Sequence, residues 1–199
     1  LIVADASTAL PPAQALLALM LFQATRLPAR LDAGGDLVLL RDQDRSTWDA
    51  ALLQDAWQHF ESCARGDRLT TWHAQAAIAA THASARSYDE TDWPTLLMLY
   101  DQYHELEPTP VVALNRAIVL AHVHGPAAGM AAALPLLEHP AMRRYYLLPP
   151  TLAALAGEVV FFRATNELHS PAGDKPCRLV RRRAAAGGAG AGRAGARCS

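Results

Sequence analysis

Apolar residues recur at helical spacing along most of the chain, with polar residues between them, and this pattern predicts helices rather than strands. The first periodic segment opens at Pro11 and Pro12, since proline is tolerated in the first turn of a helix, and Pro28 is expected to end it. Its apolar side chains are Leu16, Leu17, Leu19, Met20, Leu21 and Phe22. Because they occupy nearly every side of the helix, we expect it to be buried against other helices or against a preceding segment missing from this sequence.

The next stretch, residues 32–49, joins this helix to the second one. Residues 32–36 have the Asp/Gly composition of a turn, and residues 37–40 are a short apolar run that suits an extended piece too short to imply a sheet. Ser46 and Thr47 are expected to cap the following helix, with Asp49 favourable in its first turn. Trp48 then begins an apolar face at helical spacing, and Gly66 is the expected stop.

Further helices are predicted by the pattern over residues 70–85, 92–107, 110–125, 126–137 and 148–157, with a bend at Pro135. The segment 70–85 is rich in alanine, and small side chains let two helix backbones approach closely. Trp72 and Ile78 are expected to supply its bulk. Six or seven helices with short connections and no alternating strands predict an all-α fold.

Residues 97–137 show repeat-like spacing. Tyr100, Leu106 and Pro108 close one helix, and Leu114 and Gly125 mark the next, at spacings like the tetratricopeptide pattern of about 34 residues. Ala117 stands where that pattern has glycine. We therefore expect antiparallel helical hairpins stacked as a tetratricopeptide-like α-solenoid over residues 1–157.

Residues 158–199 differ in character. After a short apolar run the sequence becomes irregular and ends in a stretch of Arg, Ala and Gly that includes Arg181, Arg182 and Arg183. A basic tail of this kind suits nucleic acid or an acidic surface. The alternatives, which we favour, are a disordered end or an out-of-frame translation of GC-rich coding sequence.

Charge and cysteine usage narrow the class of protein. Residues 1–174 carry 11 arginines against 19 acidic residues, a net charge of −8, which makes this part a poor candidate for binding a phosphate backbone by itself. Three cysteines without a paired pattern give no disulfide framework and favour a reducing cytoplasm. No membrane span and no signal peptide are expected, and the first residue, Leu1, indicates a piece of a longer protein.

The sequence gives no support for an enzyme, a metal site or a cofactor. It contains no phosphate-binding glycine loop, no His-Glu-x-x-His and no Cys-x-x-Cys. His122 and His124 point to different sides of a helix. Asp42, Asp44 and Asp49 would suit a hard metal or an acid–base pair. Because they alternate with two arginines, we prefer a salt-bridged loop with a helix cap.

The most distinctive stretch lies at residues 37–49, with the sequence Leu-Val-Leu-Leu-Arg-Asp-Gln-Asp-Arg-Ser-Thr-Trp-Asp. Supporting blocks follow in order at residues 75–80, 91–93 and 110–117, and one precedes it at residues 16–21. Together these blocks resemble the C-terminal tetratricopeptide-like extension of a group of extracytoplasmic-function (ECF) RNA polymerase sigma factors, over about residues 10–157. The signature residues of the resemblance are Arg41, Asp42, Asp44, Arg45, Trp48, Asn115 and Arg116.

The resemblance implies a regulatory, protein-interaction domain that contributes to transcription initiation in the intact, cytoplasmic protein. Its implied partners are the RNA polymerase core, the sigma regions of the same protein, or a regulatory protein or peptide. Promoter DNA is reached only through the sigma regions, which would precede residue 1, so no DNA-reading residue is carried over. Two alternatives stay open: a free-standing tetratricopeptide-like adaptor unrelated to transcription, and an enzyme that uses Asp42 and Asp44.

Overall fold

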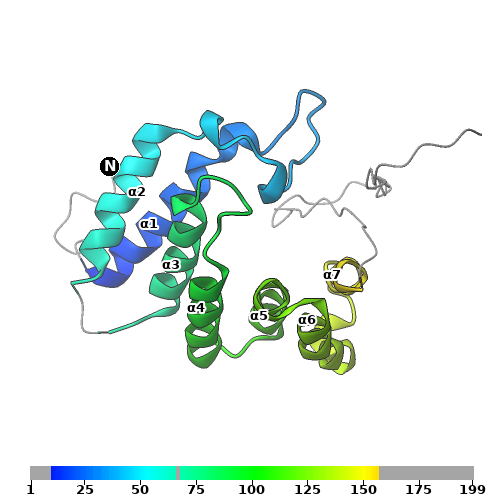
Figure 1. Cartoon of the computed structure of the whole chain (residues 1–199). Coiled ribbons are helices and arrows are strands. Elements are labelled where there is room, and N and C mark those ends of the chain that lie inside the picture. The colour runs from blue at the N-terminus through cyan, green and yellow to red at the C-terminus, as the bar shows by residue number, and fades with distance from the viewer. Residues whose placement is uncertain (1–9, 66–67, 157–199) are drawn as a thin grey trace, which may run out of the picture.

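The computed structural model describes residues 10–65 and 68–156, and this part of the chain is all-α, as predicted. Its helices are α1 (Pro11–Thr25), α2 (Ala50–Cys63), α3 (Thr71–Ser84), α4 (Trp93–Leu106), α5 (Pro110–His124), α6 (Pro126–Ala133) and α7 (Leu148–Leu155). Figure 1 shows them following one another in space, from α1 and α2 at one end to α6 and α7 at the other. Most of them pack mainly on their neighbours in the sequence, although α3 packs on α1 more than on α2, and the architecture is solenoid-like.

Local capping chemistry places the middle helices as the sequence predicts. The Asp92 carboxylate accepts a hydrogen bond from the Thr95 N–H at the start of α4 (3.0 Å), and the Thr109 hydroxyl accepts one from the Val112 N–H at the start of α5 (3.3 Å). Gly125 ends α5 with a φ of +91°, a conformation in which a side chain would be strained. These interactions involve residues close in sequence, which explains why the pattern along the chain predicted the bounds of α4 and α5.

The expected start of the second helix is wrong. Its cap is Asp49, whose carboxylate accepts hydrogen bonds from the N–H groups of Ala51 and Leu52 (2.9 and 3.0 Å). Ser46 lies earlier, in a short 3-10 segment, Arg45–Thr47, which Asp44 caps. Trp48 therefore precedes α2 instead of opening its apolar face.

Two helices end before the proline that was expected to end or bend them. Helix α1 stops at Thr25, and Pro28 lies in a separate 3-10 segment, Leu27–Ala29. Helix α6 stops at Ala133, and the chain continues as a 3-10 segment, Leu134–Glu138, that contains Pro135. The residue before a proline avoids the α conformation, so a break is favoured over a bend.

The N-terminal core forms where α1, α2 and α3 meet. Its buried members are Ala18, Phe22, Ala56, Ala76 and Ala80. The alanines of α3 thus allow the expected close approach to α1. The described residues bury only one side of α1: Ala18 and Phe22 face the core, whereas the Met20 side chain is 60% exposed. Trp72, expected to fill the core from α3, is also exposed, whereas Ile78 is buried.

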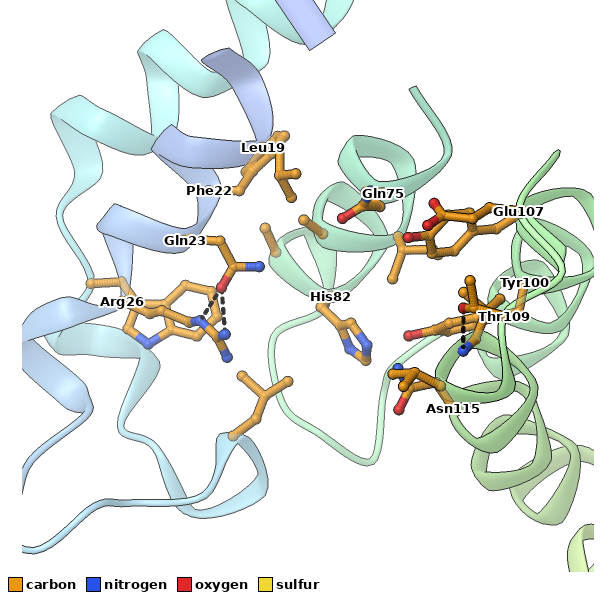
Figure 2. Close-up of a pocket in the computed structure, with 18 residues that line it drawn as sticks. Leu19, Phe22, Gln23, Arg26, Gln75, His82, Tyr100, Glu107, Thr109 and Asn115 are labelled. Carbon is orange, nitrogen blue, oxygen red and sulfur yellow. Dashed lines mark hydrogen bonds between the residues drawn. The ribbon is translucent and has the colours of Figure 1, made fainter. Parts of the chain in front are cut away.

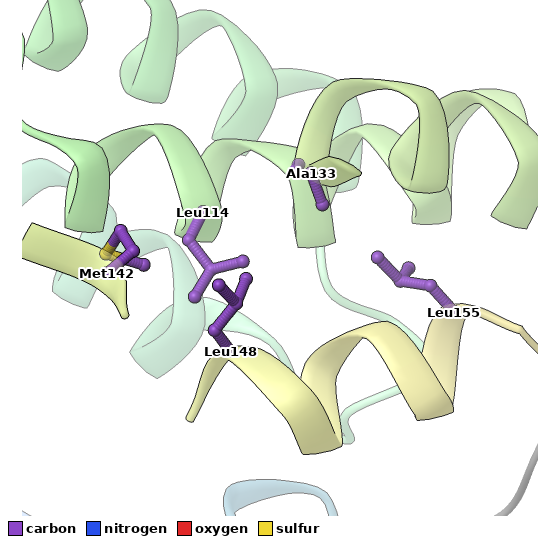
Figure 3. Close-up of a cluster of buried hydrophobic side chains, with 6 residues drawn as sticks. Leu114, Ala133, Met142, Leu148 and Leu155 are labelled. Atoms are coloured by element: carbon purple, nitrogen blue, oxygen red, sulfur yellow. The ribbon is translucent and has the colours of Figure 1, made fainter. Parts of the chain in front are cut away.

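The C-terminal core lies between α5, α6 and α7. Its buried members are Leu114, Ala117, Ala133, Met142, Leu148 and Leu155 (Figure 3). Gly129 of α6 lies directly against α5: a Cβ added there would come within 2.5 Å of the Ala121 Cβ and 2.7 Å of the Ala117 carbonyl oxygen. The small residue at position 117 therefore serves the same close packing that the repeat pattern implies for glycine.

Two expectations fall outside this description. Gly66 and the tail at residues 158–199 lie outside the described residues, so the predicted helix stop and the predicted tail stay predictions. Among the helices that the structure does describe, none combines the length and apolar character needed to cross a membrane.

Candidate functional site

The segment between α1 and α2 reaches toward the middle of the chain and forms one border of the candidate site. It is tied back on itself by the Asp32 carboxylate, which accepts hydrogen bonds from the N–H groups of Gly34 and Asp36 (2.9 and 2.8 Å). An isolated antiparallel bridge between Leu31 and Leu37 closes the turn. The predicted turn is confirmed, while the apolar run after it is only briefly extended before a 3-10 segment, Leu40–Asp42.

Arg45 has a different role from the one expected. Its guanidinium donates hydrogen bonds to the carbonyl oxygens of His82 and Ala85, at 2.5 and 2.7 Å. These carbonyls lie at the C-terminal end of α3, where a cation also complements the helix dipole. The same guanidinium lies over the Trp48 ring, 4.9 Å from its centroid. The prediction of a salt-bridged loop is therefore wrong for Arg45, which joins the loop to α3.

The carboxylates of the loop do not form a metal site. Asp44 accepts hydrogen bonds from the N–H and hydroxyl of Ser46 (2.9 and 2.7 Å), which lower the pKa of the Asp44 carboxyl. Asp49 caps α2, and Asp42 is exposed. Within the described residues, no group of three or more His, Cys, Asp or Glu side chains is placed to hold a metal ion.

An aromatic cluster links α3, α4 and α5 beside the loop. The His122 and Trp93 rings are stacked, with centroids 3.7 Å apart and an interplanar angle of 8°. The Tyr88 hydroxyl lies 3.2 Å from His122 Nε2, and the Arg41 guanidinium lies over the Tyr88 ring, 5.7 Å from its centroid. The sequence interpretation of His122 as a structural residue agrees with this stacking.

His82 lies between the loop and the aromatic cluster. Burial, reinforced by the positive charges of Arg45 and Arg26 and by His122, lowers the pKa of His82 to about 4. The imidazole is therefore neutral near pH 7. Its Nδ1 is buried without a hydrogen-bond partner in the described part of the chain.

These elements enclose a cavity of about 670 Å³. Figure 2 shows Gln23 of α1 and the next residue after that helix, Arg26, on one wall and His82 of α3 between the walls. Tyr100, Thr109 and Asn115 lie on the side formed by α4 and α5 (Figure 2). Its remaining lining is largely aromatic and aliphatic. A concave, mostly apolar surface with a few polar groups is the usual form of a binding site.

A second cavity of about 510 Å³ lies between α5, α7 and the loop, with a predominantly apolar lining. Leu114, Ile118 and Leu155 contribute to it, and Arg41 lies at its border with Leu39. Asn115 lines both cavities, so the two adjoin at this residue. We call the two cavities together the concave groove.

The structure therefore brings together some, but not all, of the signature residues. Trp48 and Asn115 line the first cavity, Arg41 lines the second, and Arg45 holds the loop beside them. Arg116 instead faces Asp101 of α4 in a partly exposed ion pair, and Asp42 and Asp44 lie at the exposed surface of the loop. Most of the signature residues therefore lie at the border of the groove or outside it, and few lie in its interior.

Sequence reasoning missed the polar residues inside the groove, namely Gln23, Arg26, Gln75, His82 and Glu107. Each interrupts an apolar helical pattern or closes it, which is a weak signal when taken alone. Arg26 would have been the easiest of them to predict from the sequence, because it is the first charged residue after a long apolar helix.

The described part of the chain is an all-α, solenoid-like fold with a concave groove. Residues 2–64 match a protein family described as a family of unknown function (DUF6596). An uncharacterized protein of Rhizobium meliloti (strain 1021) is 41% identical over 136 residues, which cover 68% of this chain and 32% of that protein. The chain thus spans about a third of the length of this curated relative. No solved structure gives a significant match.

Proposed function

We propose that this chain is the C-terminal regulatory module of an ECF-type RNA polymerase sigma factor and that it acts by binding protein. In the intact, cytoplasmic protein it would modulate promoter-specific initiation by contacting the polymerase core or the sigma regions of the same protein. We expect no catalysis and no cofactor. The observation that carries the proposal is the concave groove, because stacked helical hairpins offer such a surface to a peptide or helix of a partner.

Two further observations support the proposal. The described helices reproduce the hairpin architecture that the sigma factor resemblance implies. The relative from Rhizobium meliloti is also much longer than the matched segment, which leaves room for sigma regions in a protein of this kind.

Titrations of the labelled chain test the proposal. We expect saturable binding to the RNA polymerase core or to separately purified sigma regions, and no sequence-specific binding to a promoter duplex. Gln75→Ala should weaken the protein contact because Gln75 lines the groove. Gln54→Ala is the matched control, since Gln54 is an exposed glutamine of α2 that lines neither cavity.

The outcome discriminates between classes of function. Tight, sequence-specific promoter binding by the chain alone would contradict a module that reads no DNA. Failure to bind both polymerase and sigma regions would instead favour a free-standing adaptor. In-frame sigma regions in the coding sequence upstream of Leu1 would decide between the same two alternatives independently.

A further inference from the structure

We propose that the first cavity of the concave groove binds an acidic side chain of a partner peptide, with Arg26 as the residue that receives its carboxylate. This inference rests on the proposed use of the groove for protein binding, but it does not depend on a role in transcription.

Gln23 holds the Arg26 guanidinium at the wall of the cavity. Its Nε and Nη2 donate hydrogen bonds to the same oxygen, Gln23 Oε1, at 3.1 and 2.5 Å. This contact uses one edge of the guanidinium and fixes its plane. The other edge offers Nη1 and the second hydrogen of Nη2, which have no partner among the described residues, and Arg26 lines the cavity. A guanidinium edge of this kind matches the two oxygens of a carboxylate.

The surroundings of Arg26 leave its positive charge without a counter-ion. Its hydrogen-bond partner, Gln23, is a neutral amide, and no carboxylate of the described residues forms an ion pair with Arg26. Burial and the nearby charge of Arg30 lower the pKa of Arg26 to about 10, so the group stays protonated at neutral pH but is poorly solvated. Arrival of a carboxylate would supply the missing charge partner, and an unpaired buried charge is costly.

The negative charge of the cavity lies apart from Arg26. Glu107 lines the cavity from the end of α4, beside Tyr103 of the same helix. Burial, together with the charge of Glu107 and a hydrogen bond to it, raises the pKa of Tyr103 to about 12. In Figure 2, Arg26 and Glu107 lie on opposite walls. An acidic ligand group is therefore attracted to the α1 wall and repelled from the α4 wall, which fixes its orientation.

The shape of the groove favours a peptide over a small organic acid. Asn115 lines both cavities, so a bound chain that places its acidic side chain beside Arg26 meets an apolar cavity next. The side-chain amides of Gln75 and Asn115 carry both donors and acceptors, which suits pairing with a peptide backbone. The lining thus predicts a motif with an acidic residue followed by an apolar one.

A peptide array tests this inference on the full chain. The probes are short peptides with one central glutamate and randomised small or apolar neighbours, each beside its glutamine counterpart. Peptides selected on the array are then measured by fluorescence anisotropy. We expect the glutamate form to bind at least about tenfold more tightly than the glutamine form, as charge-assisted hydrogen bonds predict.

Variants identify the residue that receives the carboxylate. Arg26→Gln should abolish the preference for glutamate, and Arg26→Lys should retain part of it, because the charge remains but the paired donors are lost. Arg30→Gln is the matched control: it removes the same charge nearby, but Arg30 lines neither cavity. Circular dichroism and thermal melting establish that each variant is folded.

Three results would overturn the inference: equal binding of glutamate and glutamine peptides, equal losses for Arg26→Gln and Arg30→Gln, or binding of N-acetylglutamate amide as tight as that of the peptide. The last result would assign the cavity to a small carboxylate. Since the probes are synthetic peptides, failure here leaves binding to polymerase or sigma regions standing. Conversely, if the chain binds glutamate peptides selectively but binds neither polymerase nor sigma regions, only the proposed sigma factor role would be contradicted.

Discussion

The two ends of the solenoid achieve close helix packing by different means. At the N-terminal end, α1 and α3 approach each other closely because the residues between them are alanines. The space against α2 is filled by three aromatic rings, those of Phe22, Trp57 and Phe60. At the C-terminal end, a single glycine, Gly129, lets α6 lie against α5, and aliphatic side chains with Met142 fill the rest. The first end should therefore be sensitive to the loss of side-chain volume and the second to its gain.

The largest effect is expected from Phe22→Ala at the N-terminal end. The Phe22 ring is 3% exposed and packs edge-to-face on Trp57, with centroids 5.1 Å apart. Its removal should lower the free energy of unfolding by about 3–5 kcal/mol, as typical for truncation of a buried aromatic residue. Urea denaturation measures the change. Met20→Ala on the exposed side of the same helix is the control, and an equal loss there would contradict the contrast.

The second-largest loss of stability is expected on acidification, through protonation of His82 at the junction between the loop and α3. Because burial holds the pKa of His82 at about 4 in the folded protein, below its ordinary 6.5, the unfolded chain binds the proton more readily. The free energy of unfolding is therefore at its full value above about pH 6.5. It decreases by up to about 3 kcal/mol as the pH falls toward 4.

Urea titrations at several pH values measure this loss. His82→Gln should reduce the slope in that window, while His122, whose pKa burial and Arg41 also lower, retains part of it. Asp44 and Asp92 have lowered pKa values, so their contribution is lost only at still lower pH. An unchanged slope in His82→Gln would contradict the assignment.

Gly129→Ala tests the C-terminal end by adding volume. The new methyl group would meet the Ala117 carbonyl oxygen and the Ala121 Cβ, so α5 and α6 must separate. We expect a loss of about 1–3 kcal/mol despite the higher helix propensity of alanine. Thermal melting checks the prediction against Ala127→Val, which enlarges an exposed residue of the same helix. A more stable Gly129→Ala would show that the close approach is not required.

Arg45→Gln tests the contact that attaches the loop to the N-terminal end. Two hydrogen bonds from a charged donor to the last carbonyls of α3 would be lost, at a cost of about 1.5 kcal/mol. Arg65→Gln, at an exposed site after α2, serves as the control. Hydrogen exchange should show faster opening at the end of α3 in Arg45→Gln, and uniform protection in both variants would argue against this role.

The smallest effect is expected in the middle of the solenoid, from Arg116→Ala. Its ion pair with Asp101 joins α5 to α4, but the two side chains are 34% and 46% exposed. Pairs that are this accessible contribute about 0–1 kcal/mol and weaken with salt. Denaturation at low and high salt measures the contribution. A loss of stability as large as that of Phe22→Ala would contradict the prediction that this exposed ion pair contributes little.

Particular residues show where sequence reasoning succeeded and where it did not. Asp92, Pro110 and Gly125 placed the ends of α4 and α5 correctly, because each acts on backbone groups within a few residues. Ser46 and Asp49 both have side chains that can cap a helix, so the local sequence does not distinguish the cap of α2. The contact of the Asp49 N–H with the Thr25 carbonyl oxygen (2.9 Å), between segments distant in sequence, marks the actual start.

Local patterns in the sequence determined the helical class, the order of the helices and most of their ends, since hydrophobic period and capping depend on near neighbours. Tertiary structure alone decided that Arg45 binds the end of α3 instead of the adjacent carboxylates, that Gly129 rather than an alanine sets the α5–α6 contact, and that Arg26 faces a cavity. The physical reason is the same in each case. A partner brought from another helix by folding fixes the role of a side chain, and the spacing of residues along one helix carries no record of it.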